Sequence, residues 1–472
     1  MATIQSLGVG SGLDVNSIIT QLLAIERQPL SRLQRLTAGV ETEISAFGNI
    51  RSKADAVGTA AEALADEDTW RKTTVNLNGA NEFTVTTAGN ASPVTLDVEI
   101  SALAQRQSIS TKPFESSSST VGTGVLTLQR GSWSAGFGAF TAATDVPPVQ
   151  ISIGPGQDTL AGMRDAINAA SAGVTASILT DASGARLVIR SEHSGAENGF
   201  SITTSASSGE FDALSYTAQR DPATAAGAQG NTRATNLQGR VDGASVESTT
   251  NTLSNVLPGI SIRASTTTSS PRSVTIEHDR ADMRAKVDAL VTAFNDMMGY
   301  IKAQTAYNEA TKTSATLQGD RAALLVQSQF RELASSTTQA SQVFTRLSDV
   351  GISLQTDGKL KIDGSKLDNA LEDVDEVARL FSIDQAGTSN DGVALRLAAL
   401  VDQLISPEGA IERKQSTLRD RLQRHKDDQV RLEERVADVE KRLRAQYTAL
   451  DSKMSKLNGL GSYVAQQFGN SK

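Results

Sequence analysis

The sequence predicts a multidomain α+β protein in which helices from both termini form a coiled-coil stem and β-rich domains are inserted between them. Two long amphipathic segments lie near opposite ends of the chain, at about residues 30–65 and 408–460. Between them, no lysine occurs from residue 113 to residue 285, and alternating Thr, Ser, Val and Ile replace helical spacing. Because strands repeat every two residues and helices every 3.6, this change of period indicates a change of secondary structure.

The C-terminal segment, from about Glu408 to Leu460, is the longest predicted helix. No proline follows Pro407, and apolar residues recur at steps of three and four. They form one stripe: Leu418, Leu422, Leu432, Val436, Val439, Leu443, Leu450, Met454 and Leu457. Such a helix would be roughly 70 Å long at ~1.5 Å per residue, so its stripe needs a partner. His425 and Gln429 fall on this stripe, where polar residues can fix coiled-coil register. A long bundle helix inside one domain is the alternative.

The N-terminal part predicts two further helices. Residues 1–12 are glycine-rich but lack the G-x-G-x-x-G spacing of a dinucleotide-binding loop. The first helix follows Asp14 or Asn16 as its N-cap, and Pro29 ends or kinks it. The second runs from about Leu30 to Ala65, with a stripe of Leu33, Leu36, Val40, Ile44, Phe47, Ile50, Ala54, Val57, Ala61 and Leu64. The simplest explanation of two long stripes is that the termini pack together.

The central part predicts β structure. Strands are expected near residues 83–86, 94–100, 125–128, 149–153, 260–262 and 274–277, with one helix at 159–170. A hairpin is expected at residues 174–190, turning at 181–184. Residues 203–252 contain few large apolar side chains, so exposed strands and loops are expected there. The insertion is assigned residues 73–277 and two β-rich domains.

Helical spacing returns near Asp279. Helices are expected at residues 279–301, from Arg321 to about Phe344, at 373–381 and at 393–404. Asp357-Gly358 between two alternating runs predicts a β-hairpin. We therefore assign residues 1–45 with 430–472 to a coiled-coil leg, and residues 46–72 with 278–429 to a helical stem domain with a short hairpin.

Composition excludes several classes of function. The 472 residues carry a net charge of −8 and no cysteine, so neither a nucleic-acid partner nor disulfides, thiol catalysis or cysteine-bound metals are expected. His193, His278 and His425 lie far apart in the sequence, and none has an acid-rich cluster nearby, so a metal site or a catalytic triad is not expected. No usual secretory signal and no membrane-spanning apolar run are present. We predict a protein that is not an enzyme and uses no cofactor.

Several motifs resemble the bacterial flagellar filament cap family, the hook-associated protein 2 family. Gly10-Ser-Gly-Leu-Asp-Val and Glu26-Arg-Gln-Pro-Leu are similar to its N-terminal signature. Gly173-Val-Thr-Ala-Ser-Ile, preceded by Arg164-Asp-Ala-Ile-Asn, is similar to a repeat of hook-associated proteins. Val350-Gly-Ile-Ser-Leu and Asp357-Gly-Lys-Leu resemble the pattern before the last helices of the family.

The resemblance implies a homo-oligomer at the distal tip of the filament, exported by the flagellar type III apparatus. Its helical legs would contact the growing end, and its β domains would cover the channel while flagellin folds into place. Implied partners are other copies of the chain, flagellin, the hook–filament junction protein and a type III export chaperone at the C-terminal helix. The predicted interface with the filament and with other copies comprises Leu13, Asp14, Val15, Ile18, Ile19, Leu22, Ile25, Pro29, Leu33, Val40, Val436, Val439, Leu443, Leu450, Met454 and Leu457.

Two alternatives stay open at the level of sequence. A hook–filament junction protein would share the export route and terminal helices but should lack the Gly-Leu-Asp-Val signature. A surface adhesin role of the β domains, with host mucin as ligand, would be tested by mucin binding to residues 75–275. We also expect residues 1–30 and 447–472 to order only on assembly, because isolated helices of about 15 residues are marginal in water.

Overall fold

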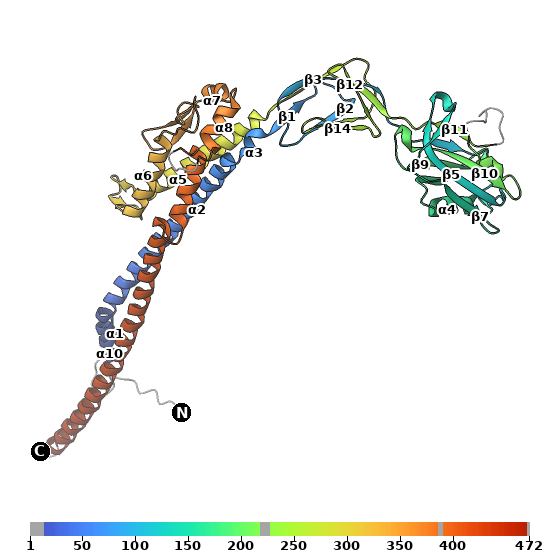
Figure 1. The fold of residues 1–472 in the computed structure, drawn as a ribbon. Helices are drawn as coiled ribbons and strands as arrows, with labels where there is room; N and C mark the ends of the chain where they lie inside the picture. Colours follow the sequence, from blue (N-terminus) through green and yellow to red (C-terminus); the bar gives the residue numbers. More distant parts are fainter. Residues whose placement is uncertain (1–13, 218–226, 386–389, 470–472) are drawn as a thin grey trace. The chain divides into compact units, whose positions relative to one another are not determined.

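The computed structural model describes residues 14–217, 227–385 and 390–469, and the chain divides into two compact units (Figure 1). Unit 1 comprises Met1–Trp70 and Arg280–Lys472, and unit 2 comprises Arg71–Asp279. The sequence-based limits of the insertion, residues 73 and 277, lie two residues inside the limits of unit 2. The finer division of unit 1 into leg and stem stays a prediction.

Unit 1 begins with two helices separated at a single residue. In α1 (Val15–Glu26), the Asp14 carboxylate accepts a hydrogen bond from the Ser17 amide at 3.0 Å and caps the helix. After Arg27, α2 (Gln28–Ala65) starts with Pro29 in its first turn, where a missing N–H group breaks no helical hydrogen bond. Pro29 therefore interrupts the helix as the sequence predicts. The short α3 (Glu67–Arg71) follows.

The C-terminal helix α10 (Ala410–Gly469) contains 60 residues and passes through Gly459 and Gly461. It extends nine residues beyond the expected end at Leu460. Each glycine destabilises a helix by only about 1 kcal/mol, and no proline follows, so nothing in this segment stops the helix. Residues of α2 and α10 that contact each other run in opposite order, Thr37 with Gln429 and Arg51 with Glu412. The two helices therefore lie side by side and antiparallel (Figure 1).

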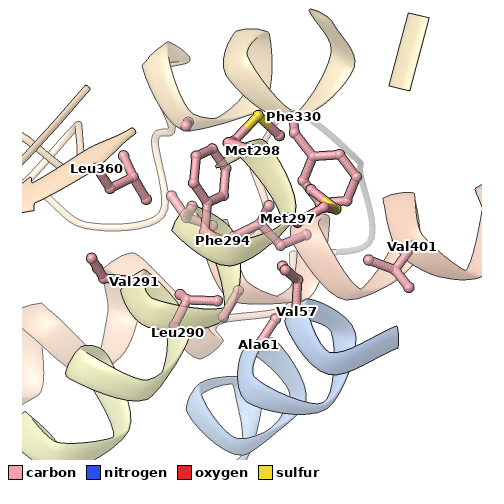
Figure 2. Packing of buried hydrophobic residues seen from close by; sticks show 14 of the residues in the cluster. Val57, Ala61, Leu290, Val291, Phe294, Met297, Met298, Phe330, Leu360 and Val401 are labelled. Carbon is pink, nitrogen blue, oxygen red and sulfur yellow. The ribbon is translucent and has the colours of Figure 1, made fainter. Parts of the chain in front are cut away.

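The core of unit 1 forms where α2 meets α5 (Arg280–Thr305), α6 (Arg321–Ser335) and α9 (Val393–Ile405). Figure 2 shows Phe294, Met297 and Met298 of α5 between Phe330 of α6 and the side chains of α2. The predicted apolar positions of α5 are all buried: Met283, Val287, Leu290, Phe294, Met297 and Ile301. Trp70 stacks on Phe381 with ring centroids 5.5 Å apart, which ties α3 to the same core.

Helix α6 ends at Ser335, so the expected continuation to Phe344 is wrong. Small hydroxyl side chains in the following segment bond the backbone instead, which competes with helical hydrogen bonding. Ser336 Oγ donates to the Leu333 carbonyl at 2.7 Å, and Thr338 Oγ1 donates to the Asp391 carbonyl at 3.0 Å. Ser341 Oγ donates to Glu376 Oε2 at 2.6 Å, and this bond holds the pKa of Glu376 below its ordinary value.

Short elements complete unit 1. The hairpin β19 (Ile352–Leu354) and β20 (Leu360–Ile362) turns at Gly358, whose φ of +88° favours glycine. This confirms the predicted Asp-Gly hairpin. Next come α7 (Gly364–Ala370), which the sequence analysis missed, and α8 (Val374–Ser382). A second small hairpin joins β17 (Tyr307–Asn308) to β18 (Thr313–Ser314).

The first β domain of unit 2 packs two antiparallel sheets around an aliphatic core. One sheet has the order β1 (Thr73–Asn76), β16 (Arg272–His278), β3 (Val94–Ala102), β12 (Leu237–Val241) and β13 (Ala244–Ser248). The other has the order β14 (Thr252–Leu257), β15 (Ile260–Ala264) and β2 (Phe83–Thr87). Alternate residues of the strands, such as Leu96, Val98 and Ile100, point into this core.

The second β domain has its own core between two further sheets. β5 (Gly124–Trp133) pairs with β10 (Gly199–Ala206), β6 (Phe140–Ala142) and β7 (Val149–Ile153). The other sheet has the order β11 (Gln229–Thr232), β4 (Ser108–Ser110), β9 (Gly184–Ser191) and β8 (Val174–Asp181). The predicted hairpin is confirmed as β8 and β9, and the predicted helix as α4 (Leu160–Ala169) with Thr159 as N-cap.

Residues 203–252 contribute more to the cores than their composition suggests. Phe211, Leu214 and Leu237 are fully buried, and Tyr216 packs beside Trp133 with ring centroids 5.2 Å apart. The expectation of exposed strands and loops is therefore wrong for these positions. Few large apolar residues occur here, but Phe211, Leu214 and Leu237 all point into a core.

We expect residues 71–279 to fold as an isolated fragment. The two ends of the fragment meet in one sheet, where Thr73 of β1 pairs with His278 of β16. The fragment should show one or more cooperative thermal transitions by circular dichroism. A fragment that starts at residue 80 lacks β1 and should melt at a lower temperature. A structureless 71–279 fragment would mean that unit 2 needs unit 1 to fold.

We also expect opposite effects from leucine at two glycines of α2. A Cβ atom at Gly58 would lie 3.0 Å from Val401 Cγ1, whereas one at Gly48 would meet only a side-chain amide at 3.9 Å. Gly58→Leu should destabilise unit 1 by about 1–3 kcal/mol through overpacking against α9. Gly48→Leu should stabilise it by about 0.5–1 kcal/mol, because leucine favours a helix over glycine. Urea unfolding of both variants measures the difference, and equal effects would contradict the close approach of α2 and α9.

Candidate assembly surface

The lower part of the leg is a small apolar cluster between α1 and α10. Val15, Ile19 and Leu23 are buried, and they are spaced four residues apart along one face of α1. They pack against Val436, which is also buried, and against the half-buried side chains of Val439, Leu443 and Tyr447 on α10. The stripe predicted from sequence therefore brings residues from opposite ends of the chain into contact.

The contact between α2 and α10 includes a partly buried polar pair. Gln429 Nε2 donates a hydrogen bond to Thr37 Oγ1 at 2.7 Å, and Thr37 is only 8% exposed. Leu36, which the predicted stripe included, is 45% exposed instead. Both positions fit a step of three or four, but the amide of Gln429 needs a hydrogen-bonding partner and Thr37 supplies it. The helix is therefore turned so that Thr37, not Leu36, faces α10.

Ion pairs tie α10 to the rest of unit 1 near its N-terminal end. Arg51 Nη1 lies 2.8 Å from Glu412 Oε2, and Lys414 Nζ lies 2.7 Å from Asp320 Oδ2. Pairs of this kind that are open to solvent contribute about 0–1 kcal/mol each. Buried apolar residues of α10 such as Ile411 and Leu418 therefore contribute more to holding the helix in place.

The predicted interface residues fall into different environments. Val15, Ile19, Val40 and Val436 are buried inside the leg, and Ile18, Leu33, Val439, Leu443 and Met454 are partly buried. Asp14, Leu22, Ile25, Pro29, Leu450 and Leu457 are exposed. Leu13 lies outside the described residues. The structure thus separates positions that hold the leg together from positions that are open to a partner, and the role of either group in assembly stays a prediction.

Beyond Tyr447, α10 presents apolar side chains to solvent. Leu450 is 44% exposed, Leu457 62% and Val464 48%, and these three residues repeat every seven positions. Leu460 and Tyr463 add to the same stretch. A seven-residue apolar repeat on a helix surface is typical of a seam that packs against another helix. This exposed stretch, residues 448–464, is named here the α10 tail.

A groove of about 490 Å³ opens between residues 29–36 of α2 and residues 428–435 of α10. Leu33, Leu36 and Leu432 supply apolar surface, and Arg32 and Arg435 lie beside them. The groove also contains the ion pair of Arg431 with Asp428. We name this surface the α2/α10 groove. It combines apolar contact area with positive charge.

Sequence reasoning left three leg residues out of the interface. Tyr447 continues the step of four from Leu443, and Leu23 continues the step of four from Ile19, so regular spacing could have identified both. Thr37 carries no such signal, because its place in the seam depends on Gln429 across the helix pair.

The histidines and acidic side chains form no metal-binding group in the part of the chain that the structure describes. The three histidines lie on separate elements, His193 after β9, His278 at the end of β16 and His425 on α10. Residues 14–217, 227–385 and 390–469 contain no group of three or more His, Asp or Glu side chains arranged to hold a metal ion. Over the same residues, no helix combines the length and apolar character that crossing a membrane requires.

Comparison with known protein families assigns most of the chain. Residues 234–459 match the model of the flagellar hook-associated protein 2 C-terminus, and residues 11–107 match that of its N-terminus. Together these two matches cover more than two thirds of the chain. Residues 139–192 match the flagellin hook IN motif, which here spans β6 to β9.

Individual relatives extend over the full length. Flagellar hook-associated protein 2 of Escherichia coli K12 is 29% identical over 483 aligned positions, which cover 100% of this chain and 99% of the relative. A-type flagellar hook-associated protein 2 of Pseudomonas aeruginosa is 27% identical, with 97% of this chain and 96% of the relative covered.

The crystal structure of the D1-D2-D3 domains of the Escherichia coli flagellar cap protein FliD is 26% identical, with a TM-score of 0.57. It covers 79% of this chain and 99% of that one. The two terminal family models, in their expected order along the chain, and the full-length relatives show that the chain belongs to the flagellar hook-associated protein 2 family.

Proposed function

We propose that this protein caps the distal tip of a flagellar filament as a homo-oligomer and promotes the insertion of exported flagellin. The observation that carries the proposal is the α10 tail, an exposed apolar stripe at the end of a leg that both chain ends build. The similarity to the Escherichia coli cap structure and to full-length hook-associated proteins 2 supports the same function. The alternative of a hook–filament junction protein is not favoured by these relatives.

The mechanism is steric and interfacial, with no covalent step. The α10 tail and the exposed face of α1, including Leu22 and Ile25, would bind the apolar helices at the growing filament end. Burial of apolar surface is worth about 25 cal/mol per Å², so several such side chains can hold a leg in place reversibly. The β domains of unit 2 would cover the channel while flagellin folds. Folding and packing of flagellin would supply the free energy for each addition.

The finer partners follow from the same surface. Before assembly, an exposed apolar stripe favours aggregation in water, and a binding protein that covers it would prevent this. We assign an export chaperone to the α10 tail at that stage. After export through the type III apparatus, the tail would be released to the filament end and to the hook–filament junction protein on which the first cap assembles.

Complementation tests the function directly. The full chain is expressed in a flagellated bacterium whose own cap protein has been deleted, and filament length and flagellin in the medium are measured. Long filaments and little free flagellin are expected. The same chain ending at residue 447 should be exported but should leave flagellin in the medium. Loss of flagellin despite export of the full chain would contradict the proposal.

Leu443→Asp should weaken cap assembly while leaving unit 2 folded. Leu443 is half-buried against α1, and placing a carboxylate there should cost the leg about 1–3 kcal/mol. Ala445→Asp adds the same charge at an exposed position of α10 and serves as the control. Oligomer mass and motility should fall for Leu443→Asp only. Equal behaviour of the two variants would show that the contact of α1 with α10 does not contribute to assembly.

Hydrogen exchange should distinguish the chain ends in soluble protein from the same ends in the assembled cap. The structure shows α1 and α10, up to Gly469, as helices. We expect the amides of these end segments to become protected from exchange only on assembly. Amides of residues 14–26 and 447–466 should exchange rapidly in soluble protein and slowly in capped filaments. The core helix α5 serves as the internal reference and should be protected in both. Full protection of the ends in monomeric protein would contradict this expectation.

A further inference from the structure

The α2/α10 groove has the chemistry of a site for an acidic, apolar surface. Its apolar residues Leu33, Leu36 and Leu432 lie beside Arg32 and Arg435. Arg431 is neutralised by Asp428, but Arg32 and Arg435 have no carboxylate partner within the described residues. Such a groove favours an apolar side chain flanked by carboxylates, because each unpaired arginine would gain a charge-assisted hydrogen bond.

A different face of the same helix carries the complementary chemistry. Val430 is 54% exposed, and Glu434 lies one turn further along α10. Asp427 lies three residues before Val430 and is also exposed. At ~100° per residue, the mean direction of these three positions is roughly 120° around the helix from that of the residues that α10 contributes to the groove. We name Asp427, Val430 and Glu434 the acidic stripe.

We infer that the α2/α10 groove of one copy binds the acidic stripe of the next copy in the cap. In a ring whose rotation axis runs along the legs, equivalent residues of all copies lie at equal height. The groove spans residues 428–435 of α10, so the neighbour presents residues of the same level, and the acidic stripe spans 427–434. Val430 would then enter the apolar groove while Glu434 reaches Arg435 or Arg32.

The two surfaces differ, so the contact is of the head-to-tail kind. An interface between unlike surfaces passes from copy to copy and closes when the rotation completes a ring, whereas a self-complementary surface stops at a dimer. Each copy would use its groove on one side and its acidic stripe on the other. The inference names the partner of the leg and rests on the proposed function of an oligomeric cap.

Cysteine cross-linking tests the contact. The sequence contains no native cysteine, so disulfides can form only between the introduced residues. The full chain carrying both Leu36→Cys and Val430→Cys is oxidised under conditions of assembly. We expect a ladder of disulfide-linked species larger than a dimer. Leu36→Cys and Val430→Cys alone should give no ladder and little dimer. Monomer alone from the double variant, or efficient dimers from a single variant, would overturn the inference.

A charge swap tests the same contact without cross-linking. Arg435→Glu and Glu434→Arg should each weaken self-association about tenfold or more, because like charges then face each other. The chain with both changes restores opposite charges across the contact and should recover assembly. Lack of recovery, or no effect of either single change, would overturn the inference.

Wild-type controls distinguish a wrong position of the contact from a wrong function of the protein. If the wild-type chain restores filament growth and assembles, but neither cross-linking nor charge swap behaves as described, only the position of the contact is wrong. If the wild-type chain is exported and supports no filament growth, the proposed function itself fails. A ladder together with failed complementation would leave an oligomer with a different role.

Discussion

The antiparallel packing of α2 on α10 is the contact on which the structure of unit 1 depends. Both helices also belong to the core that α5, α6 and α9 build, so their register is shared by the leg and the core. Within the core, the close approach of α2 to α9 at Gly58 leaves little freedom for α2 to slide. The position of Thr37 opposite Gln429 is therefore set from the core as well as from the seam.

The seam combines a nonspecific and a specific component. Apolar burial supplies most of the attraction, but it tolerates a shift of one heptad at modest cost. The bond of Gln429 to Thr37 resists such a shift, because a slipped helix would separate the partly buried amide of Gln429 from this partner. Ion pairs at the surface, such as Arg51 with Glu412, add little to either component. A polar contact thus helps to define how two otherwise repetitive helices align.

The sequence predicted long elements well because their signals are local and repeated. The apolar steps of α5, the Asp-Gly turn between β19 and β20 and the cap at Asp14 all depend on neighbours within a few residues. Failures have long-range causes: α6 ends at Ser335 because hydroxyls after it find partners such as Asp391 and Glu376. Residues 203–252 were misjudged because burial of Phe211 is decided by other strands.

The candidate interface shows the same division. Spacing alone placed Val15, Ile19 and Val436 on facing stripes, and these residues meet in the structure. The sequence of α2 alone could not show that Thr37, rather than Leu36, faces α10. Leu36 and Thr37 are adjacent, and both fit the helical spacing that starts at Leu33. The complementary charges of Arg435 and Glu434 also become informative only when the surface to which each belongs is known.

The unbroken length of α10 has a mechanical consequence. A helix of 60 residues at ~1.5 Å per residue is a rod of roughly 90 Å, and no proline provides a hinge along it. One end is clamped among Ile411, Leu418 and the other core residues, and the other end carries the α10 tail. Torque or axial load applied at the tail is therefore delivered to the packed helices with little loss to bending. A partner that binds the α10 tail would therefore act on the core of unit 1 through a single helix.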